Sequence, residues 1–292
     1  MLQLRVAAFA VALLATGCST TLSTLQPAEP MKPLHVQANA AMDVVVPVSR
    51  VVDAVDVTAS LADKYASDPG YKPSDAEQKQ ALGAAVGLGL SSPGVNPDLM
   101  LRMGLVKNLD VGLRWSAISV HGDAKYRFLA TRDPSAEEEA DEAKSSSGIG
   151  NGPDRGFQGS ISIGLSKALY RGFIFDLLDQ LKINDYSRWN LEIPIIFGTR
   201  IKDFGHVWFG PKYIYSHYSL DASLQNVGIV PETSGSIHHL GGFGGIALGY
   251  KVVYLFAELT IAKMWAKPEI FGQKTDLGGI TVMPAFGLMF RI

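Results

Sequence analysis

Charged side chains stand at alternate positions inside several otherwise apolar segments of this chain. The neighbours of Arg114, for example, are Leu113 and Trp115. Ionised groups that are removed from water are costly unless they are paired, so these groups must pair with one another or contact water. They predict either a network of ion pairs that fills a protein interior or, since seven are basic, a narrow anion-preferring passage. The eleven residues are Asp43, Arg102, Asp110, Arg114, Lys125, Arg127, Glu192, Arg200, Lys212, Glu258 and Arg291.

Patterns that carry catalysis or metal binding are absent from the sequence. There is no Gly-x-Ser-x-Gly elbow, His-Glu-x-x-His helix or phosphate-binding loop. Ser216 and His217 could supply a hydroxyl and an imidazole at a lipid interface, but one histidine beside serines is far more often a loop residue. His238 and His239 lack a carboxylate at metal-ligand spacing. We therefore expect no enzyme, no metal and no other cofactor.

The last segment of the chain, residues 278–292, shows which kind of element must position the charged residues. Every second residue from 280 to 292 is apolar, and the residues between them end in Arg291. This alternation predicts a strand, because successive side chains of a strand point to opposite faces. About ten segments repeat the pattern with ionisable residues on the second face, as a membrane barrel requires. The sequence thus predicts an all-β fold: an up-and-down antiparallel transmembrane β-barrel of about ten strands.

Two stretches interrupt the strand pattern. Residues 48–92 follow the first strand with apolar residues at helical spacing, and Ser74 with Glu77 forms a capping box that opens a second helix. We expect a helical hairpin insertion that caps the barrel mouth, with a plug inside the lumen as the alternative. Residues 131–155 are rich in Glu, Asp, Ser and Gly, which predicts a disordered acidic loop.

The N-terminus has the pattern of an export signal. Arg5 precedes an apolar run over residues 6–15 that is too short to span a bilayer as a helix. The following residues Ala15-Thr16-Gly17-Cys18 resemble the lipoprotein box of bacterial lipoproteins, in which the cysteine becomes the lipidated first residue. The alternative is an ordinary signal peptide with an incidental cysteine.

The lipoprotein resemblance divides the chain into three parts. It implies a signal peptide at residues 1–17 and a lipid on Cys18, and Ser19 in place of an aspartate implies the outer membrane. Residues 18–33, with Ser, Thr and Pro, predict a tether. Residues 34–292 are expected to form the barrel domain.

The C-terminus carries a second resemblance. Alternating Phe286, Leu288, Phe290 and Ile292 resemble the C-terminal signal of outer-membrane proteins, although that signal usually ends in phenylalanine. The resemblance implies the barrel-assembly machinery as a partner. We expect Arg291 inside the lumen near the periplasmic rim, and the sequence leaves open whether an acidic partner such as Glu258 or Asp43 is within reach.

Loop lengths and aromatic residues predict an orientation. Short turns near Lys107, Asp203 and Lys251 are expected on the periplasmic side together with the lipidated N-terminus, and the helical insertion on the outer side. The acidic loop at residues 131–155 is the exception, because it falls on the periplasmic side by this count: either it is an unusual inner loop or the strand count is wrong nearby. Tyr170, Trp189 and Trp265 near outer strand ends and Trp208 near an inner one predict interfacial girdles.

The leading interpretation is a lipid-anchored, integral outer-membrane barrel of the bacterial cell envelope that acts as a narrow, porin-like pore or as a structural and surface-interaction component. Its expected partners are outer-membrane lipid and an envelope protein at the loops; a net charge of −2 gives no case for nucleic acid. One alternative is a soluble surface or periplasmic lipoprotein barrel that binds an apolar ligand. The other is an outer-membrane lipid-modifying enzyme.

Overall fold

The computed structural model of the chain describes residues 21–68, 70–74, 76–77, 80–81, 83–84, 93–116, 119–131, 156–168, 181–201, 204–224, 228–229, 233–267, 269–270, 273–274 and 278–292. Three predicted features fall outside these residues: the signal peptide with Cys18, the acidic loop except for its first residue, and Tyr170.

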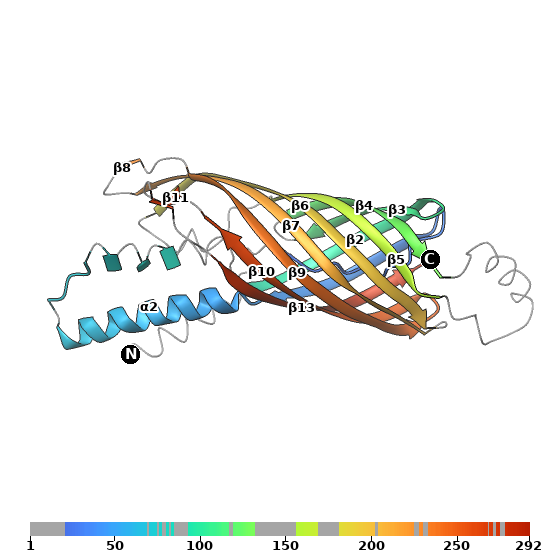
Figure 1. Cartoon of the computed structure of the whole chain (residues 1–292), viewed down its shortest axis with the longest axis horizontal. Helices are drawn as coiled ribbons and strands as arrows, with labels where there is room; N and C mark the ends of the chain where they lie inside the picture. Colours follow the sequence, from blue (N-terminus) through green and yellow to red (C-terminus); the bar gives the residue numbers. More distant parts are fainter. Residues whose placement is uncertain are drawn as a thin grey trace, which may run out of the picture.

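Ten antiparallel strands close into a barrel (Figure 1). Strands that are neighbours along the chain are neighbours round the barrel, and β1 pairs with β13 to complete the ring. The predicted fold class is therefore confirmed. The strands are β1 (Val36–Val45), β2 (Gly94–Val106), β3 (Leu109–Ser116), β4 (Ser119–Ala130), β5 (Gln158–Ala168), β6 (Leu181–Ile201), β7 (Gly205–Leu224), β9 (Thr233–Tyr250), β10 (Val253–Ala266) and β13 (Gly279–Arg291).

Three two-residue strands lie at the ends of the long ones. β8 (Gly228–Ile229) pairs with the end of β7, and β11 (Glu269–Ile270) pairs with β12 (Gln273–Lys274) as a small separate ribbon. They take no part in closing the barrel.

The barrel turns apolar residues outward and polar residues inward. Exposed and buried residues alternate along the whole of β10. Leu255 on its outer face is 68% exposed, whereas Tyr254 and Glu258 on its inner face are buried. Exposed leucine, isoleucine and phenylalanine recur on the outer faces of the other strands, and buried charges on their inner faces. This is the reverse of a water-soluble domain, in which charges are almost never fully buried.

The two ends of the barrel differ, and we name them by their connections. The turn mouth carries the turn at residues 107–108, the link between β6 and β7, the turn at residues 251–252, and the longer connection between β4 and β5. Asn108 and Lys251 adopt positive φ values of 71° and 55° in these turns. The helix mouth is the opposite end, where β1 ends beside the start of β2.

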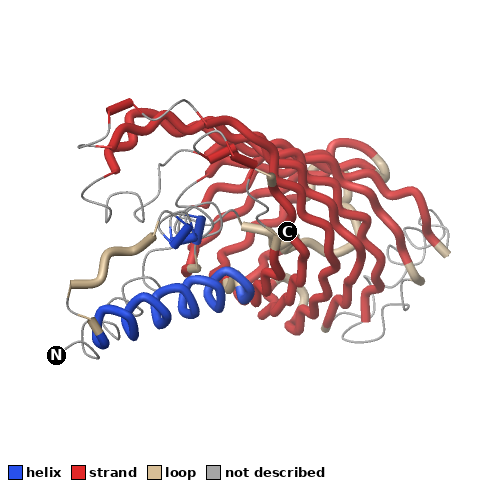
Figure 2. Tube along the Cα trace, turned by 60° about the vertical axis from the view of Figure 1, so that its left-hand side comes forward, coloured by secondary structure: helices blue, strands red, loops and turns tan. Residues whose placement is uncertain are grey.

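The helix α2 (Val48–Ser67) follows β1 and stands outside the ring of strands at the helix mouth (Figure 2). It is joined to β13 by a hydrogen bond of 3.0 Å from Ile280 N to Ser49 Oγ and by an Arg50 contact with Gly278 O. The first helix of the predicted insertion is thus confirmed, and it does not plug the lumen. The second helix lies largely outside the described residues, among which no helix is long and apolar enough to cross a membrane.

The glycine-rich part of β9 makes room for a large side chain inside the barrel. Trp208 of β7 is fully buried, and a Cβ atom on Gly245 would lie 2.4 Å from its ring. Trp208 was expected in an interfacial girdle; it points inward instead, since it shares the inner face of β7 with Lys212. The missing side chain of Gly245 therefore leaves the space that the Trp208 ring occupies inside the barrel.

Candidate functional site: the charged lumen

A stretch without regular secondary structure, residues 21–31, lies inside the barrel and is here called the lumen segment. All of its residues are buried. It begins at Thr21, whose hydroxyl contacts Asp43 and Asp98 near the helix mouth. It ends at Met31, whose N–H donates to Asp110 Oδ2 at 2.9 Å near the turn mouth. The sequence predicts a tether at residues 18–33, but its described part crosses the lumen.

Near the helix mouth, two basic residues hold carbonyl oxygens of the segment. Lys212 Nζ donates to Leu22 O, and Arg114 Nη1 donates to Ser23 O at 2.7 Å. Asp43 accepts hydrogen bonds from the hydroxyl of Ser23 as well as from that of Thr21. A peptide group that is buried without a partner costs free energy, so these wall charges are what allow a polar backbone to lie here.

At the middle of the barrel, Glu258 is the main acceptor. Its carboxylate accepts the N–H groups of Thr24 and Leu25 at 2.5 and 2.9 Å, and Oε2 also accepts the indole N–H of Trp208 at 2.8 Å. Asn39 Nδ2 donates to Leu25 O at 2.7 Å. Glu258 is thus held by three N–H donors, two of which belong to the lumen segment.

Near the turn mouth, Lys125 and Arg291 hold the end of the segment. Lys125 Nζ donates to Pro27 O at 3.0 Å and to Glu29 O at 3.4 Å. Arg291 Nη1 pairs with Glu29 Oε2 at 3.1 Å. The sequence leaves open whether Glu258 or Asp43 can reach Arg291; in the structure its acidic partner is Glu29 of the lumen segment.

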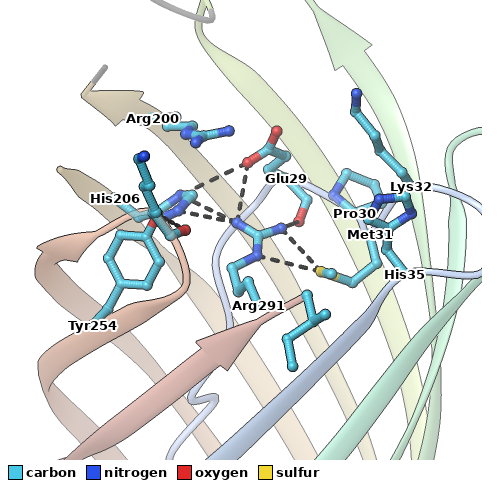
Figure 3. Close-up of a pocket in the computed structure, with 11 residues that line it drawn as sticks. Glu29, Pro30, Met31, Lys32, His35, Arg200, His206, Tyr254 and Arg291 are labelled. Carbon is cyan, nitrogen blue, oxygen red and sulfur yellow. Dashed lines mark hydrogen bonds and ion pairs between the residues drawn. The ribbon is translucent and has the colours of Figure 1, made fainter. Parts of the chain in front are cut away.

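A cavity of about 180 Å³ opens beside this pair (Figure 3). Arg291 points into it and lies 3.1 Å from His206 Nε2 and 3.2 Å from Met31 Sδ. Arg200 and Lys251 also line it. The turn mouth is therefore rich in basic side chains, and the only lumen-segment residues that line the cavity are its last three, Glu29, Pro30 and Met31.

The wall of the barrel carries ion pairs of its own. Arg102 contacts both Asp110 and Asp123, and Lys125 Nζ lies 3.4 Å from Asp110 Oδ2. All four side chains are almost completely buried. Buried ions keep their charge only when they are paired and hydrogen-bonded, and this cluster meets that condition.

A second group of ion pairs lies nearer the helix mouth. Lys212 Nζ is 2.7 Å from Glu192 Oε1, and Arg114 Nε is 3.8 Å from Asp98 Oδ1. Lys212 and Arg114 therefore bind wall carboxylates and the lumen segment together.

The structure places the eleven sequence-predicted charged residues in two groups. Eight are buried in the lumen, and three are half-buried close to the turn mouth, where Arg127 bonds to Asn108 Oδ1. The buried ones are Asp43, Arg102, Asp110, Arg114, Lys125, Glu192, Lys212 and Glu258; the half-buried ones are Arg127, Arg200 and Arg291.

Sequence reasoning missed four buried charged residues of the same interior: Asp98, Asp123, Arg188 and Glu29. Asp98 precedes the expected start of its strand, and Asp123 follows a His-Gly pair that reads as a turn. Both are in phase with Arg102 or Lys125 on their own strands, so a longer alternation would have found them. With them, acids nearly equal bases among the described lumen residues, which removes the charge excess behind an anion preference.

The serine and histidine candidates for catalysis do not converge. Ser216 points inward and accepts a hydrogen bond from Arg188 Nη2 at 3.2 Å. His217 is on the outer face, with its ring 5.9 Å from that of Trp189. His238 likewise faces outward to Tyr213, whereas its neighbour in sequence is buried on the inner face. Within the described residues, no three His, Cys, Asp or Glu side chains are placed to hold a metal ion.

Comparison with solved structures gives distant similarities. Neisserial surface protein A has a TM-score of 0.34 and 10% identity over 90% of this chain and 100% of that one. The outer membrane protease OmpT from Escherichia coli has a TM-score of 0.42 and 8% identity, covering 92% and 100%. The attachment invasion locus protein Ail of Yersinia pestis has a TM-score of 0.30 and 9% identity, covering 90% and 100%. No family model and no curated protein matches the sequence.

Proposed function

We propose that this protein is an integral outer-membrane β-barrel, anchored in addition by a lipid on Cys18, that serves as a structural and surface-interaction component with a closed lumen. The observation that carries the closed lumen is the lumen segment. It occupies the bore from near one mouth to near the other and bonds to charges on all sides.

The outer surface of the barrel supports the membrane part of the proposal. Its exposed side chains are mainly leucine, isoleucine, valine and phenylalanine. Aromatic residues gather on the outer wall near both mouths: Trp189 packs on Tyr215 at 5.4 Å, and Phe157 stacks on Phe197 at 5.9 Å. An apolar band between aromatic girdles is the surface that a lipid bilayer requires of a barrel.

The interior argues against the two alternatives that need an open or apolar cavity. An apolar ligand binds in a largely apolar pocket, whereas this lumen is lined by ion pairs and filled by a backbone. A pore needs a water path, and the charges that would line it are engaged by the lumen segment. A barrel of about eight strands is just filled by side chains, and ten strands leave room for one extended chain.

Two measurements test membrane integration and the lipid. We expect the protein to stay in the membrane during carbonate extraction and to migrate differently in electrophoresis before and after heating. Mass spectrometry should find a diacylglyceryl mass on Cys18 that the C18A variant lacks. Release by carbonate alone would exclude the integral barrel, and an unmodified Cys18 would exclude the anchor.

Conductance in planar bilayers tests the closed lumen. We expect wild-type protein to be silent, and we expect the variant with Arg114 and Arg200 neutralised (R114M/R200M) to be silent as well. Steady anion-selective current through the wild-type protein, changed by the same variant, would establish the pore instead. R127M is the control, because Arg127 bonds to Asn108 and Gln158 on the wall.

A further inference from the structure

We propose that the lumen segment carries the N-terminus through the barrel, so that the lipid anchor lies in the membrane leaflet at the helix mouth. This inference rests on the proposed function, which supplies the membrane and the lipid, and it adds their geometry. The sequence alone predicts the opposite arrangement, with the anchor on the side of the short turns.

The direction of the crossing follows from the contacts at its two ends. Thr21 lies beside Asp43 and Asp98, close to where β1 ends and β2 begins at the helix mouth. Glu29 lies beside Arg291, the last residue of β13, at the turn mouth. The chain therefore runs from the helix mouth to the turn mouth, reverses near residue 34, and returns as β1.

The chain reverses its direction in a tight turn at residues 32–35. His35 N bonds to Lys32 O at 3.0 Å, Leu34 N bonds to Gly104 O at 2.9 Å, and Leu34 has a positive φ of 65°. Gly104 has no side chain to block this approach, since a Cβ there would lie 2.0 Å from Lys32 O. The turn at residues 32–35, after which the chain enters β1, thus packs against Gly104 of β2.

Chain length decides on which side an anchor can lie. Cys18 precedes Thr21 by three residues, and three extended residues span at most about 11 Å. The hydrocarbon core of a bilayer is about 30 Å thick. A lipid on Cys18 can therefore leave the barrel at the helix mouth, but it cannot reach back across the membrane to the turn mouth.

Charged side chains of the barrel wall bind mainly the backbone of the lumen segment. Lys212, Arg114 and Lys125 donate to carbonyl oxygens, and Glu258 and Asp110 accept N–H groups. Five charged side chains from the four strands β3, β4, β7 and β10 thus bind peptide groups of the lumen segment. Three of the four connections at the turn mouth are short, and residues 131–157 between β4 and β5 are the exception. Because short turns face the periplasm in barrels of this kind, we place the helix mouth and the anchor on the outer side, beside α2.

Cross-linking tests the crossing in the full-length membrane-inserted protein. The natural sequence has one cysteine, which the lipid blocks, so introduced pairs are the reactive thiols. A short bifunctional thiol reagent should link T21C/D98C at the helix mouth and E29C/R291C at the turn mouth. The mixed pair T21C/R291C should not link. A linked mixed pair, or failure of both matched pairs in a barrel that still shows heat-modifiable migration, would overturn the inference.

Thiol labelling of intact cells tests the side of the anchor. With a membrane-impermeant maleimide, T20C and S60C on α2 should react to the same extent before and after permeabilisation, whereas K107C at the turn mouth should react only after it. A T20C variant that behaves like K107C would overturn the inference. If T20C reacts in neither state, S60C decides, because α2 stands at the helix mouth: reaction of S60C only after permeabilisation would overturn the inference.

The same experiments separate this inference from the proposed function. Loss of the lipid mass with intact cross-links removes the anchor but keeps the crossing. A lipid mass with no cross-link at either mouth keeps the proposed function and removes the crossing.

Discussion

Arg102 shows how the barrel keeps a charge in its interior. Its two terminal nitrogens contact Asp110 and Asp123, and its side chain has no exposed surface. Removing one partner of a buried pair leaves the other charge uncompensated, which costs more than the pair itself contributes.

We expect R102M to lower the free energy of unfolding by about 3–5 kcal/mol, because two buried carboxylates lose the guanidinium that pairs with them and only Asp110 keeps a lysine partner, Lys125. Urea unfolding of the barrel in lipid vesicles measures this. R127M is the matched control with an expected cost of about 1 kcal/mol, since Arg127 is half-buried at the turn mouth and bonds to neutral groups there. Equal costs for the two variants would show that Arg102 is not a buried ion in the membrane.

Gly245 allows a test of the inward position of Trp208, by the addition of a single methyl group. A Cβ there would lie 2.4 Å from the fully buried Trp208 ring, whereas a Cβ on Gly244 of the outer face would meet its nearest atoms at 3.8 and 3.9 Å. G245A should therefore destabilise the barrel by about 1–3 kcal/mol through overpacking, and G244A should be close to neutral. The same unfolding measurement compares them, and an equal effect would place Trp208 outside the lumen.

At the scale of elements, the strands were predictable and the lumen segment was not. Alternation fixed the inner face of β10 and β13, because one face meets lipid and the other meets charge. Residues 21–31 have no such period. Their Ser, Thr and Pro composition is that of a linker, and their position depends on partners such as Glu258 that are more than two hundred residues away. No local pattern records a contact of that range.

The connection after α2 depends on Glu77. Its carboxylate contacts Lys64 of α2, accepts from Tyr71 Oη at 2.5 Å, and accepts the Ser74 N–H at 2.7 Å. The Lys64 contact is the main cause that holds the pKa of Glu77 below its usual value of 4.5, and the same contact raises the pKa of Lys64. The capping box predicted from Ser74 and Glu77 is thus present.

This connection should loosen in acid. Because the pKa of Glu77 is lower in the folded state, its stabilising effect is complete above about pH 5 and is lost as the pH falls below 4.5. Hydrogen exchange of the amides around residues 64–77 should therefore accelerate from pH 7 to pH 3, after correction for intrinsic rates. E77Q should show the same exchange at both pH values, and pH-dependent exchange in E77Q would assign the effect to another group.

At the scale of the whole molecule, the barrel encloses the lumen segment. The sequence alone allows the inward charges to line a pore, whereas in the structure they form ion pairs with one another and hydrogen bonds with the lumen segment. The closed ring and the filled bore therefore depend on each other, because removing the lumen segment would leave wall charges such as Lys212 and Glu258 without the backbone groups that they bind.

Protease protection measures this arrangement directly. We expect proteinase K to leave residues 21–31 intact in the folded protein, although their composition is that of an accessible linker, and to cleave them after heat unfolding. Mass spectrometry of the retained fragment gives the boundary. Cleavage within residues 21–31 of the folded barrel would show that the segment is not held in the lumen.

The seam between β1 and β13 has a consequence for the order of assembly. The lumen segment is joined to β1 by a reversal of only a few residues, and its backbone is held by side chains from β3, β4, β7 and β10. Once β1 and β13 pair, the lumen segment could enter the closed barrel only by threading lengthwise through one mouth. It would have to pass Lys212 and Glu258 and to pull any attached acyl chains after it. Threading a finished ring in this way is slow, whereas closing an open sheet round a chain already in place needs no such passage. The β1–β13 pairing is therefore expected to form last, as the step that traps the N-terminal chain and makes its exit kinetically inaccessible.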